Sequence, residues 1–489
     1  MSHPDIVPGP APTHHTDFHD SSNIVKSSSL SQPASSKVDP TEFRKRLETM
    51  MGWMSEFSDD QMTLVVSALT PHLGASQLHF LSSQLPEHSP GLHHMCVPGC
   101  SDPLSLLPPH LSLSILAMLP PTDLATATRV CSTWRELALT SSLWQSLCRR
   151  PEYRLTQEGR DAQLERWQDS DIDWRQVFVE RYKLRRAWMG GQCHVRTFEG
   201  HTGGISCVQF DGGRIVSGSY DKMIKVWNVK TNSPWSVITL AGHSGEVRCL
   251  HLDGNRLVSG STDLTIKVWD LSISVNWSSI ACRVTMVGHT DTVRCVQMDQ
   301  TRDRVISASY DTTLKIWELK TGICVKTLRG HTAPVLAIQA DGDRLVSGGG
   351  DKTIRLWQLD TGYCVSVLQG HNDAVTCLTL DKDHQKIISG SLDRTIKVWS
   401  MSSHHCLKTL DWMSNEGHTG VIRCLQADDW RILSAADDKM IKVWDLETGQ
   451  RLQTLKSHTD GVTCLQFNDF YIVSGSYDNT VKLWDFTVC

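Results

Sequence analysis

Residues 193 to 489 contain seven copies of one sequence pattern, and this repetition constrains the fold more than any other feature of the chain. In most copies a Gly-His pair is followed by a Ser-x-Ser-x-Asp-like turn and then by an aliphatic run that ends in Trp. The paired residues are His201/Trp227, His243/Trp269, His289/Trp317, His331/Trp357, His371/Trp399, His418/Trp444 and His458/Trp484. A period of about 40 residues is too short for one repeat to bury its own apolar faces, so each repeat must pack against its neighbours.

This signature resembles the WD repeat, in which each copy forms one four-stranded blade of a β-propeller. Seven copies predict one closed, seven-bladed WD-repeat propeller over residues 191–489. A strand-like stretch, Cys193 to Phe198, precedes the first copy, and the chain ends five residues after Trp484, where a fourth strand has no room. We expect the two ends to pair within one blade, which removes the exposed sheet edges that invite aggregation.

The composition argues against several other classes of protein. The 489 residues carry a formal net charge of −5, which provides no general attraction to nucleic acid or to an anionic membrane. No apolar run approaches the roughly 18 residues that span a bilayer, and the first residues, MSHPDIVPGPAPTHH, lack the features of a signal peptide. We expect an intracellular protein, cytoplasmic and/or nuclear, that binds neither nucleic acid nor membrane.

The 16 cysteines do not predict disulfides. Six of them stand six residues after a repeat His, at equivalent positions of different blades, namely Cys207, Cys249, Cys295, Cys377, Cys424 and Cys464. We expect small buried strand residues in a reducing compartment. His93, His94, Cys96 and Cys100 are close in sequence, but no second ligand pair at zinc-finger spacing accompanies them, so we predict no metal site and no cofactor.

The chain before the repeats divides into segments of different character. Residues 1–39 are rich in Ser, Pro and His and are expected to be disordered. Residues 40–88 place apolar residues at helical spacing, with a capping box from Ser58 to Gln61. Residues 151–190 predict a helical connector rather than a flexible linker. The predicted fold is therefore multidomain, with an all-α N-terminal part followed by the all-β propeller.

Residues 101–150 are predicted to form a second compact helical unit. Two apolar helices flank Pro120-Pro121, and Thr122 or Asp123 is the expected cap of the second. The unit resembles the F-box at Leu107-Pro108, Ile115, Leu119, Asp123-Leu124, Val130-Cys131, Trp134-Arg135, Leu137-Ala138 and Leu143-Trp144. One departure is His110, which stands where the family commonly carries an acidic residue.

Each blade brings His, Ser and Asp together, as in His243, Ser259 and Asp263, which invites a catalytic interpretation. A nucleophile needs one strained, pocketed copy beside an oxyanion site, whereas this set recurs in almost every blade together with Trp. In the WD-repeat family the set resembles a structural hydrogen-bond network. A base two positions before each Trp is also spread around the ring, which favours a scaffold role over nucleic-acid binding. We predict a non-catalytic protein.

A binding surface must differ between blades where the scaffold repeats. Five residues after the repeat His the blades carry Ser206, Arg248, Arg294, Leu336, Thr376, Arg423 and Thr463. Just before the turn Asp they carry Tyr220, Thr262, Tyr310, Gly350, Leu392, Asp437 and Tyr477. Both positions are expected near one mouth of the central channel, where three Arg and three Tyr would converge. Guanidinium forks suit phosphate or carboxylate, so a phosphorylated peptide is the expected ligand.

An F-box followed by WD repeats resembles the substrate receptors of SCF-type ubiquitin ligases, of the cell-division-control type. The resemblance implies that the F-box docks a Skp-type adaptor, and through it a cullin and a RING subunit, while the propeller presents a substrate for ubiquitination and degradation. It implies degron contacts by Arg248, Arg294, Arg423, Tyr220, Tyr310 and Tyr477. It also implies adaptor contacts by some of the apolar positions Leu107, Pro108, Ile115, Leu116 and Leu119, others of which form the core of the unit.

Several alternatives stay open from the sequence. Thr262 stands where that receptor type can carry a further Arg, so an acidic or unmodified degron is an alternative to a phosphorylated one. The Arg residues could also be ordinary solvated charges, and the chain could be an interaction scaffold without ligase partners. The helices from Phe43 to Leu85 resemble the segment that can mediate homodimerisation in this family, which adds a homodimer to the expectations.

Overall fold

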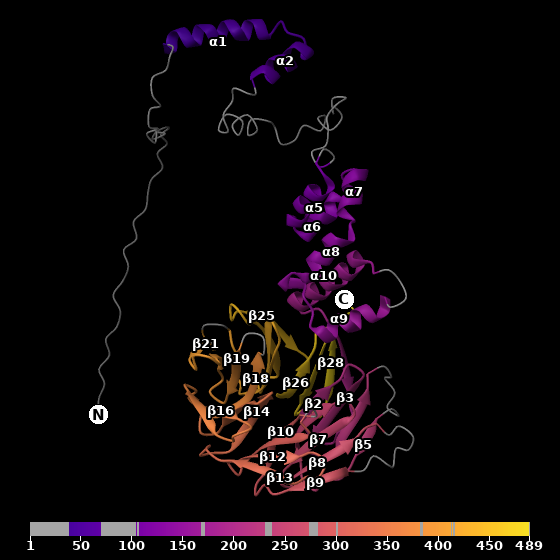
Figure 1. Cartoon of the computed structure of the whole chain (residues 1–489), viewed down its shortest axis with the longest axis vertical. Coiled ribbons are helices and arrows are strands. Elements are labelled where there is room, and N and C mark those ends of the chain that lie inside the picture. The colour runs from indigo at the N-terminus through magenta and orange to yellow at the C-terminus, as the bar shows by residue number, and fades with distance from the viewer. Residues whose placement is uncertain are drawn as a thin grey trace, which may run out of the picture. The chain divides into compact units, whose positions relative to one another are not determined.

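The structure is a computed structural model of the whole chain (Figure 1), and it describes residues 39–69, 104, 107–167, 172–229, 237–272, 282–299, 302–381, 385–411, 413 and 416–488. The chain divides into two compact units, residues 1–100 and residues 101–489, and each is described by itself. The expected disordered tail, the expected helices beyond Leu69 and the cluster from His93 to Cys100 lie outside the described residues.

The first unit contributes helices α1 (Pro40–Met54) and α2 (Asp59–Leu69). The capping box that opens α2 is present, since the Ser58 N–H donates to Gln61 Oε1 at 3.0 Å and the Gln61 N–H donates to Ser58 Oγ at 3.4 Å. Large apolar side chains such as Trp53 and Leu64 are exposed on these helices. The described residues of this unit therefore leave apolar helix faces uncovered.

Four short helices fold residues 109–149 into a compact part of the second unit: α5 (Pro109–Met118), α6 (Pro121–Ala127), α7 (Ser132–Ala138) and α8 (Ser141–Arg149). Their shared core contains Leu116, Leu124, Ala138, Leu143, Trp144 and Leu147. The expected side-chain cap of α6 is wrong. Pro121 is the first helical residue, Pro120 precedes it, and Asp123 lies inside the first turn, where its charge still favours the positive end of the helix dipole.

The segment that follows is helical, as expected, and consists of η3 (Pro151–Tyr153), α9 (Gln157–Leu164), η4 (Glu165–Trp167) and α10 (Trp174–Gly190). The first half of α10 packs on α8, where the rings of Phe178 and Trp144 lie 5.5 Å apart. The buried Arg181 donates from Nη1 to the Cys148 carbonyl at 2.9 Å. Helix α10 is thus part of the core of the helical region.

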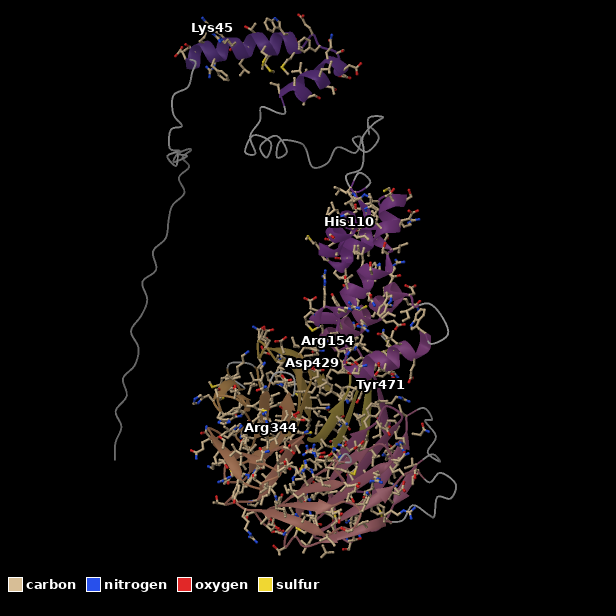
Figure 2. The ribbon with its side chains drawn as sticks, viewed as in Figure 1. Lys45, His110, Arg154, Arg344, Asp429 and Tyr471 are labelled. Carbon is tan, nitrogen blue, oxygen red and sulfur yellow. The ribbon has the colours of Figure 1, made fainter. Side chains whose placement is uncertain are left out.

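The last turn of α10 packs on the propeller. The Trp188 ring stacks on Phe486 with centroids 3.8 Å apart, and its Nε1–H donates to the Asp469 carbonyl at 2.8 Å. The Arg431 guanidinium also lies 3.7 Å from the centre of the Trp188 ring. Nearby, Thr156 Oγ1 donates a hydrogen bond to Asp469 Oδ2 at 2.6 Å. Arg154 and Asp429 mark this junction in Figure 2. One continuous helix therefore ties the helical region to the propeller.

The propeller consists of seven four-stranded antiparallel sheets, which confirms the predicted fold class. Blades one to three are β2 (Ile205–Phe210), β3 (Arg214–Ser219), β4 (Ile224–Asn228) and β5 (Ile238–Leu240); β6 (Val247–Asp253), β7 (Arg256–Ser261), β8 (Thr265–Asp270) and β9 (Cys282–Val287); β10 (Val293–Asp299), β11 (Arg304–Ser309), β12 (Leu314–Glu318) and β13 (Cys324–Leu328). Blades four and five are β14 (Val335–Asp341), β15 (Arg344–Gly349), β16 (Thr353–Gln358) and β17 (Cys364–Gln369); β18 (Val375–Asp381), β19 (Lys386–Ser391), β20 (Ile396–Ser400) and β21 (Cys406–Leu410).

Blade six is β22 (Ile422–Ala427), β23 (Arg431–Ala436), β24 (Met440–Asp445) and β25 (Arg451–Lys456). Blade seven joins β26 (Val462–Phe467), β27 (Tyr471–Ser476) and β28 (Val481–Asp485) to β1 (His194–Phe198). In the β1–β28 pair, His194 lies opposite Asp485 and Phe198 lies opposite Val481. The expected closure of the ring by the two ends of the repeat region is therefore present.

The repeated His, Ser, Trp and Asp form one buried hydrogen-bond network in every blade. The Trp indole N–H donates to the Ser hydroxyl at 2.8 to 2.9 Å. The same hydroxyl lies 2.7 to 2.9 Å from His Nε2. The His Nδ1–H donates to the turn Asp at 2.7 to 2.9 Å, because a carboxylate can only accept. Seven equivalent copies support the structural interpretation of this set.

The protonation states agree with that hydrogen-bond pattern. Burial lowers the pKa of His201, His331 and His458, which keeps these imidazoles neutral. Burial alone would raise the pKa of Asp478, but hydrogen bonds from Thr480 and His458 outweigh it and lower that pKa to about 2. In blades one, four and seven the turn is therefore held by a neutral imidazole that donates to a carboxylate.

Apolar side chains of neighbouring blades share one core. Trp317 of blade three packs in a cluster with Val258 and Ile266 of blade two, and Trp357 of blade four packs with Ile306 and Leu314 of blade three. Cys207, Cys249, Cys295, Cys377, Cys424 and Cys464 are free thiols. In the parts of the chain covered by the structure, no helix combines the length and the apolar character required to cross a bilayer.

Replacement of one network hydroxyl should destabilise the propeller. In Ser307→Ala the buried Trp317 N–H and His289 Nε2 both lose their partner, so we expect the free energy of unfolding to fall by about 2 to 4 kcal/mol. Ser244→Ala is the control, because Ser244 is exposed and contacts the turn Asp through its backbone N–H, which the substitution keeps. It should change stability by less than about 0.5 kcal/mol. Urea unfolding followed by Trp fluorescence measures both, and equal stability of the two variants would contradict the network role.

Candidate ligand site at the propeller channel

A β-bulge sits at the same place in the inner strand of every blade. The pairing register between the first and second strands skips one residue, for example between Val293 and Cys295 in blade three. The skipped residues are the seven that stand five positions after the repeat His, namely Ser206, Arg248, Arg294, Leu336, Thr376, Arg423 and Thr463. A bulge turns its extra side chain out of the alternating pattern of the sheet. It therefore explains why these residues reach the channel.

In three blades the bulged residue is part of the scaffold. Thr463 Oγ1 donates to the Ile205 carbonyl of blade one at 2.5 Å, and Thr376 Oγ1 donates to the Ile422 carbonyl of blade six at 2.6 Å. Ser206 Oγ bonds in the same way to the Val247 carbonyl of blade two. These hydroxyls link neighbouring blades, which leaves Arg248, Arg294, Leu336 and Arg423 as the bulged residues that can serve a ligand.

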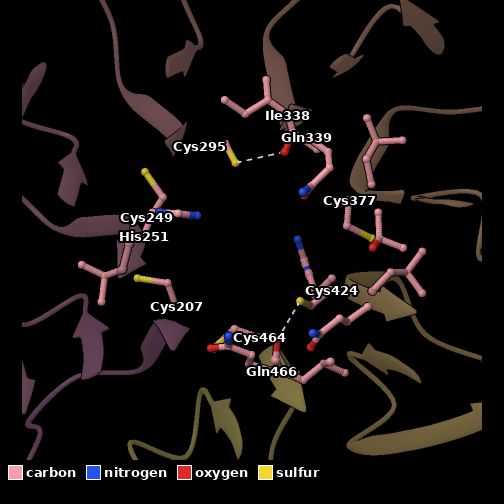
Figure 3. A pocket seen from close by; sticks show the side chains of 18 of the residues that line it. Cys207, Cys249, His251, Cys295, Ile338, Gln339, Cys377, Cys424, Cys464 and Gln466 are labelled. Carbon is pink, nitrogen blue, oxygen red and sulfur yellow. Dashed lines mark hydrogen bonds between the residues drawn. The ribbon is translucent and has the colours of Figure 1, made fainter. Parts of the chain in front are cut away.

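The channel encloses a cavity of about 430 Å³ at the centre of the inner strands (Figure 3). The three Arg line it, whereas Tyr220, Tyr310 and Tyr477 are not among the described residues of its lining. Six cysteines, Cys207, Cys249, Cys295, Cys377, Cys424 and Cys464, form a ring around it. Burial raises the pKa of Cys207 to about 12, so its thiol is neutral. Among the described residues no group of His, Cys, Asp and Glu is arranged to hold a metal ion.

Glutamine side chains link neighbouring blades along the channel. Gln297 Nε2 donates to the Ala340 carbonyl at 3.0 Å and its Oε1 accepts the Ala340 N–H at 2.6 Å. Gln426 makes the same pair of bonds to Phe467 at 3.3 and 2.7 Å. His251 takes the equivalent place in blade two, and burial lowers its pKa. The channel wall is thus stiffened by side chains as well as by packing.

A row of side chains crosses blades six, seven, one and two near the bulges, and we call it the aromatic wall. It consists of Arg423, Asp437, Tyr477, Tyr220, Arg248 and Glu246. The rings of Tyr220 and Tyr477 stack with centroids 6.0 Å apart and planes 7° apart. The Arg248 guanidinium lies 4.7 Å from the Tyr220 ring and 2.8 Å from Glu246 Oε2. Two predicted Tyr and two predicted Arg therefore belong to one contiguous group.

Arg423 is neutralised within its own blade. Its Nε donates to Asp437 Oδ1 at 2.8 Å and its Nη2 donates to Asp437 Oδ2 at 2.7 Å, a two-pronged ion pair. The hydrogen bond to Asp437 is the main reason that the pKa of Arg423 is raised. Sequence reasoning did not include Asp437 or Glu246 in the site, although both stand within the same repeats as the Arg residues that they pair with.

Arg294 differs from the other two cations. In the described part of the chain no carboxylate forms an ion pair with it. Burial acts to lower its pKa, but the neighbouring Cys295 and Tyr310 outweigh this effect and the pKa lies above its ordinary value. Tyr310, of the same blade, is 37% exposed and is not a member of the stacked Tyr220–Tyr477 pair. Arg294 therefore brings an uncompensated positive charge to the channel.

The repeated bases have scaffold contacts. Two residues before the blade Trp, Lys225, Lys267, Lys315 and Lys397 donate from Nζ to Thr239, Thr285, Thr327 and Thr409 of the outer strands. These contacts tie the third strand to the fourth and spread the charges around the ring. They agree with the scaffold role that the sequence predicted for these residues.

The predicted adaptor positions lie in two different environments. Leu116 is 1% exposed at the centre of the small helical core, so it supports the fold and presents no surface. Leu107 and Leu119 are partly buried against that core. Ile115 is 44% exposed, and Pro108 is exposed at the start of α5. Sequence reasoning did not select the exposed apolar side chains Leu111, Met118 and Val130 of the same region.

Comparison with family models agrees with this architecture. An F-box-like model matches residues 104–150. The model of the WD domain, G-beta repeat, matches seven segments that together cover more than half of the chain: 192–228, 235–270, 280–318, 322–358, 362–400, 405–445 and 449–485. The fold and the channel define a WD-repeat propeller protein with an appended F-box-like unit.

The chain is similar to proteins that carry F-box or SCF names. It is 30% identical over 155 residues to a probable E3 ubiquitin ligase complex SCF subunit, sconB, of Arthroderma otae (27% of this chain, 23% of that protein). It is 30% identical over 150 residues to an F-box protein of Saccharomyces cerevisiae (27% and 23%). It is 35% identical over 187 residues to the F-box/WD repeat-containing protein 7 of Drosophila melanogaster (36% and 13%). These matches span less than a quarter of each relative's length. With both family models matched, the chain belongs to the F-box/WD-repeat family.

Proposed function

We propose that the protein is a non-catalytic substrate receptor of an SCF-type ubiquitin ligase. The F-box-like unit would bind a Skp-type adaptor, and through it a cullin and a RING subunit, while the propeller channel would bind a phosphorylated degron. The observation that carries the proposal is the way residues 101–489 pack together. One helix, α10, packs at one end on the F-box-like unit and at the other on a propeller whose channel holds the unneutralised Arg294.

The adaptor surface follows from the exposed apolar side chains around α5. Ile115, Met118 (82% exposed), Leu111 and Val130 leave an apolar area uncovered on a unit that has its own complete core. Apolar side chains gain free energy when a partner removes them from water, at roughly 25 cal/mol per Å². We assign adaptor contact to this area together with Pro108, and a core role to Leu116.

The degron site is centred on Arg294. A guanidinium without a carboxylate partner in a concave site attracts a dianionic phosphate more than a guanidinium already paired, because no intramolecular bond must be broken first. Arg248, Arg423, Tyr220, Tyr310 and Tyr477 flank that site and would contact the peptide around the phosphate. The receptor would act by proximity, since a bound substrate is held near a conjugating enzyme recruited at the other end.

Two further expectations accompany this role. The exposed apolar faces of α1 and α2 fit a second copy of the same helices, which supports homodimerisation through residues 40–88. A receptor for a ubiquitin ligase would work in the cytoplasm and/or the nucleus. The free thiols of the six channel cysteines fit such a reducing compartment.

An acidic substitution on the proposed adaptor surface should separate binding from folding. Ile115→Glu should weaken binding of the full chain to a purified Skp-type adaptor by at least about tenfold, because a charge replaces a buried apolar contact. Val287→Glu introduces the same charge at an apolar side chain of the propeller that is 72% exposed, and it should leave adaptor binding unchanged. Calorimetric titration measures both. Unchanged binding by Ile115→Glu, with Val287→Glu as reference, would contradict the assignment.

Removal of the Arg294 guanidinium should strongly weaken phosphate recognition. A degenerate phosphoserine/phosphothreonine peptide library is the probe, and its dephosphorylated form is the reference. Arg294→Ala should weaken phosphopeptide binding by about 10- to 100-fold, the loss expected for a charge-assisted contact, and Arg294→Lys should recover only part of it.

Arg344→Ala is the matched control, because Arg344 is exposed at the end of its blade opposite to the bulge and lies outside the channel lining. It should bind the library as the wild type does. Equal binding of the phosphorylated and dephosphorylated libraries by the wild type would argue for the scaffold alternative.

A further inference from the structure

We propose that Asp437 limits the ligand to a single phosphate, by holding Arg423 in an intramolecular ion pair so that Arg294 is the cation available to a phosphorylated peptide. The inference rests on the proposed function, because it concerns the same site. Asp437 would thus determine specificity, and the expected ligands would be peptides with one phosphate at the channel mouth.

The Arg423–Asp437 pair occupies the side of the guanidinium formed by Nε and Nη2. Nε and Nη2 each donate to a different carboxylate oxygen, at 2.8 and 2.7 Å. The two side chains are about one-third exposed, 32% for Arg423 and 29% for Asp437. The paired fork leaves Nη1 and the outer face of the guanidinium for anything that approaches from the channel. A second phosphate could reach Arg423 only from the end-on side, where it would lie beside the Asp437 carboxylate.

Blade seven packs against one side of Asp437. A Cβ built on Gly461 would lie 3.1 Å from Asp437 Cα, 3.2 Å from Asp437 Oδ1 and 3.2 Å from Tyr477 Cδ2. Asp437 therefore occupies the space that a larger residue at position 461 would take. Tyr477 is in turn stacked on Tyr220. The ion pair therefore adjoins the stacked Tyr pair of the aromatic wall.

Arg248, at the other end of the aromatic wall, is also paired with a carboxylate. Its Nη2 lies 2.8 Å from Glu246 Oε2 and its guanidinium covers the Tyr220 ring. The three channel Arg and their two carboxylates thus carry a net formal charge of +1, obtained as three positive charges minus two negative ones. A phosphate monoester carries about −1.5 to −2 at neutral pH, so one phosphate already exceeds that charge.

A second phosphate near Arg423 would meet the Asp437 carboxylate as well as the cation. Two anions within a few ångströms repel each other, and the repulsion is stronger in a partly buried site than in bulk water. Among the seven residues that precede the turn Asp, Asp437 is the only acid, since the others are Tyr220, Thr262, Tyr310, Gly350, Leu392 and Tyr477. This blade is therefore distinguished by an acid at the position where it can oppose a second phosphate.

The test measures how the full chain discriminates between singly and doubly phosphorylated peptides. The probes are two degenerate peptide libraries that differ by a second phosphoserine placed four residues from the first, and binding is followed by fluorescence polarisation. For the wild type we expect the two dissociation constants to agree within about threefold. For Asp437→Asn, which keeps the size of the side chain and removes its charge, we expect the doubly phosphorylated library to bind about tenfold more tightly than the singly phosphorylated one.

Two further variants make the test specific. Asp460→Asn makes the same change in net charge at the next blade, where Asp460 Oδ1 accepts the Gly461 N–H, and it should leave the ratio at the wild-type value. In Arg423→Gln/Asp437→Asn, which replaces the ion pair by two neutral side chains, the ratio should return to the wild-type value, because the cation freed by Asp437→Asn is absent. Asp437→Ser, which also removes the carboxylate, keeps the test decisive if Asp437→Asn does not fold.

The outcomes separate this inference from the proposed function. A wild-type preference of tenfold or more for two phosphates, an unchanged ratio in Asp437→Asn, or a preference for two phosphates retained in Arg423→Gln/Asp437→Asn would each overturn the role of Asp437 while phosphate recognition stands. If the wild type binds neither library better than its dephosphorylated form, both the inference and the proposed phosphate recognition fail.

Discussion

The buried bond between each blade Trp and its Ser hydroxyl is the interaction on which the rest of the structure depends. It places the hydroxyl against the repeat His, and the His in turn holds the turn Asp, so that the same turn is formed seven times. An unpaired buried donor costs about 1 to 3 kcal/mol, so each blade is stabilised only with the full set. The turn fixes the start of the inner strand, and the bulge at that start directs one side chain per blade to the channel.

The seven blades share this network, and the candidate ligand site arises from the few bulged positions at which the blades differ. Three bulged hydroxyls are used to join blades, and the remaining bulges supply Arg248, Arg294, Leu336 and Arg423. The aromatic wall then commits Arg248 and Arg423 to carboxylates. The channel therefore has a local charge pattern that neither the overall charge of the chain nor the number of Arg residues reveals. At the other end, α10 turns the propeller and the F-box-like unit into one continuous packed structure through Trp188 and Phe178.

Much of the architecture could be predicted because it rests on spacing. The His and Trp positions recur with nearly constant separation, so they predicted seven blades and the pairing of the two ends of the repeat region in one sheet. The details that depend on three-dimensional packing could not be predicted. Ile115 and Leu116 are neighbours in sequence with similar chemistry, and only the orientation of α5 decides that one is exposed and the other buried. The Arg423–Asp437 pair requires a side-chain geometry that a repeat alignment does not contain, and Pro121 opened α6 where a side-chain cap was expected.

In the proposed function, one chain binds a ligase adaptor at its helical end and a phosphorylated ligand at its channel at the same time. The most direct measurement immobilises a Skp-type adaptor on a biosensor, captures the full chain on it, and then applies the degenerate phosphopeptide library followed by its dephosphorylated form. We expect the captured wild-type chain to bind only the phosphorylated library. We expect Arg294→Ala to be captured equally well but to bind neither library. Failure of the adaptor to capture the wild-type chain, or equal binding of the two libraries, would contradict the proposed function.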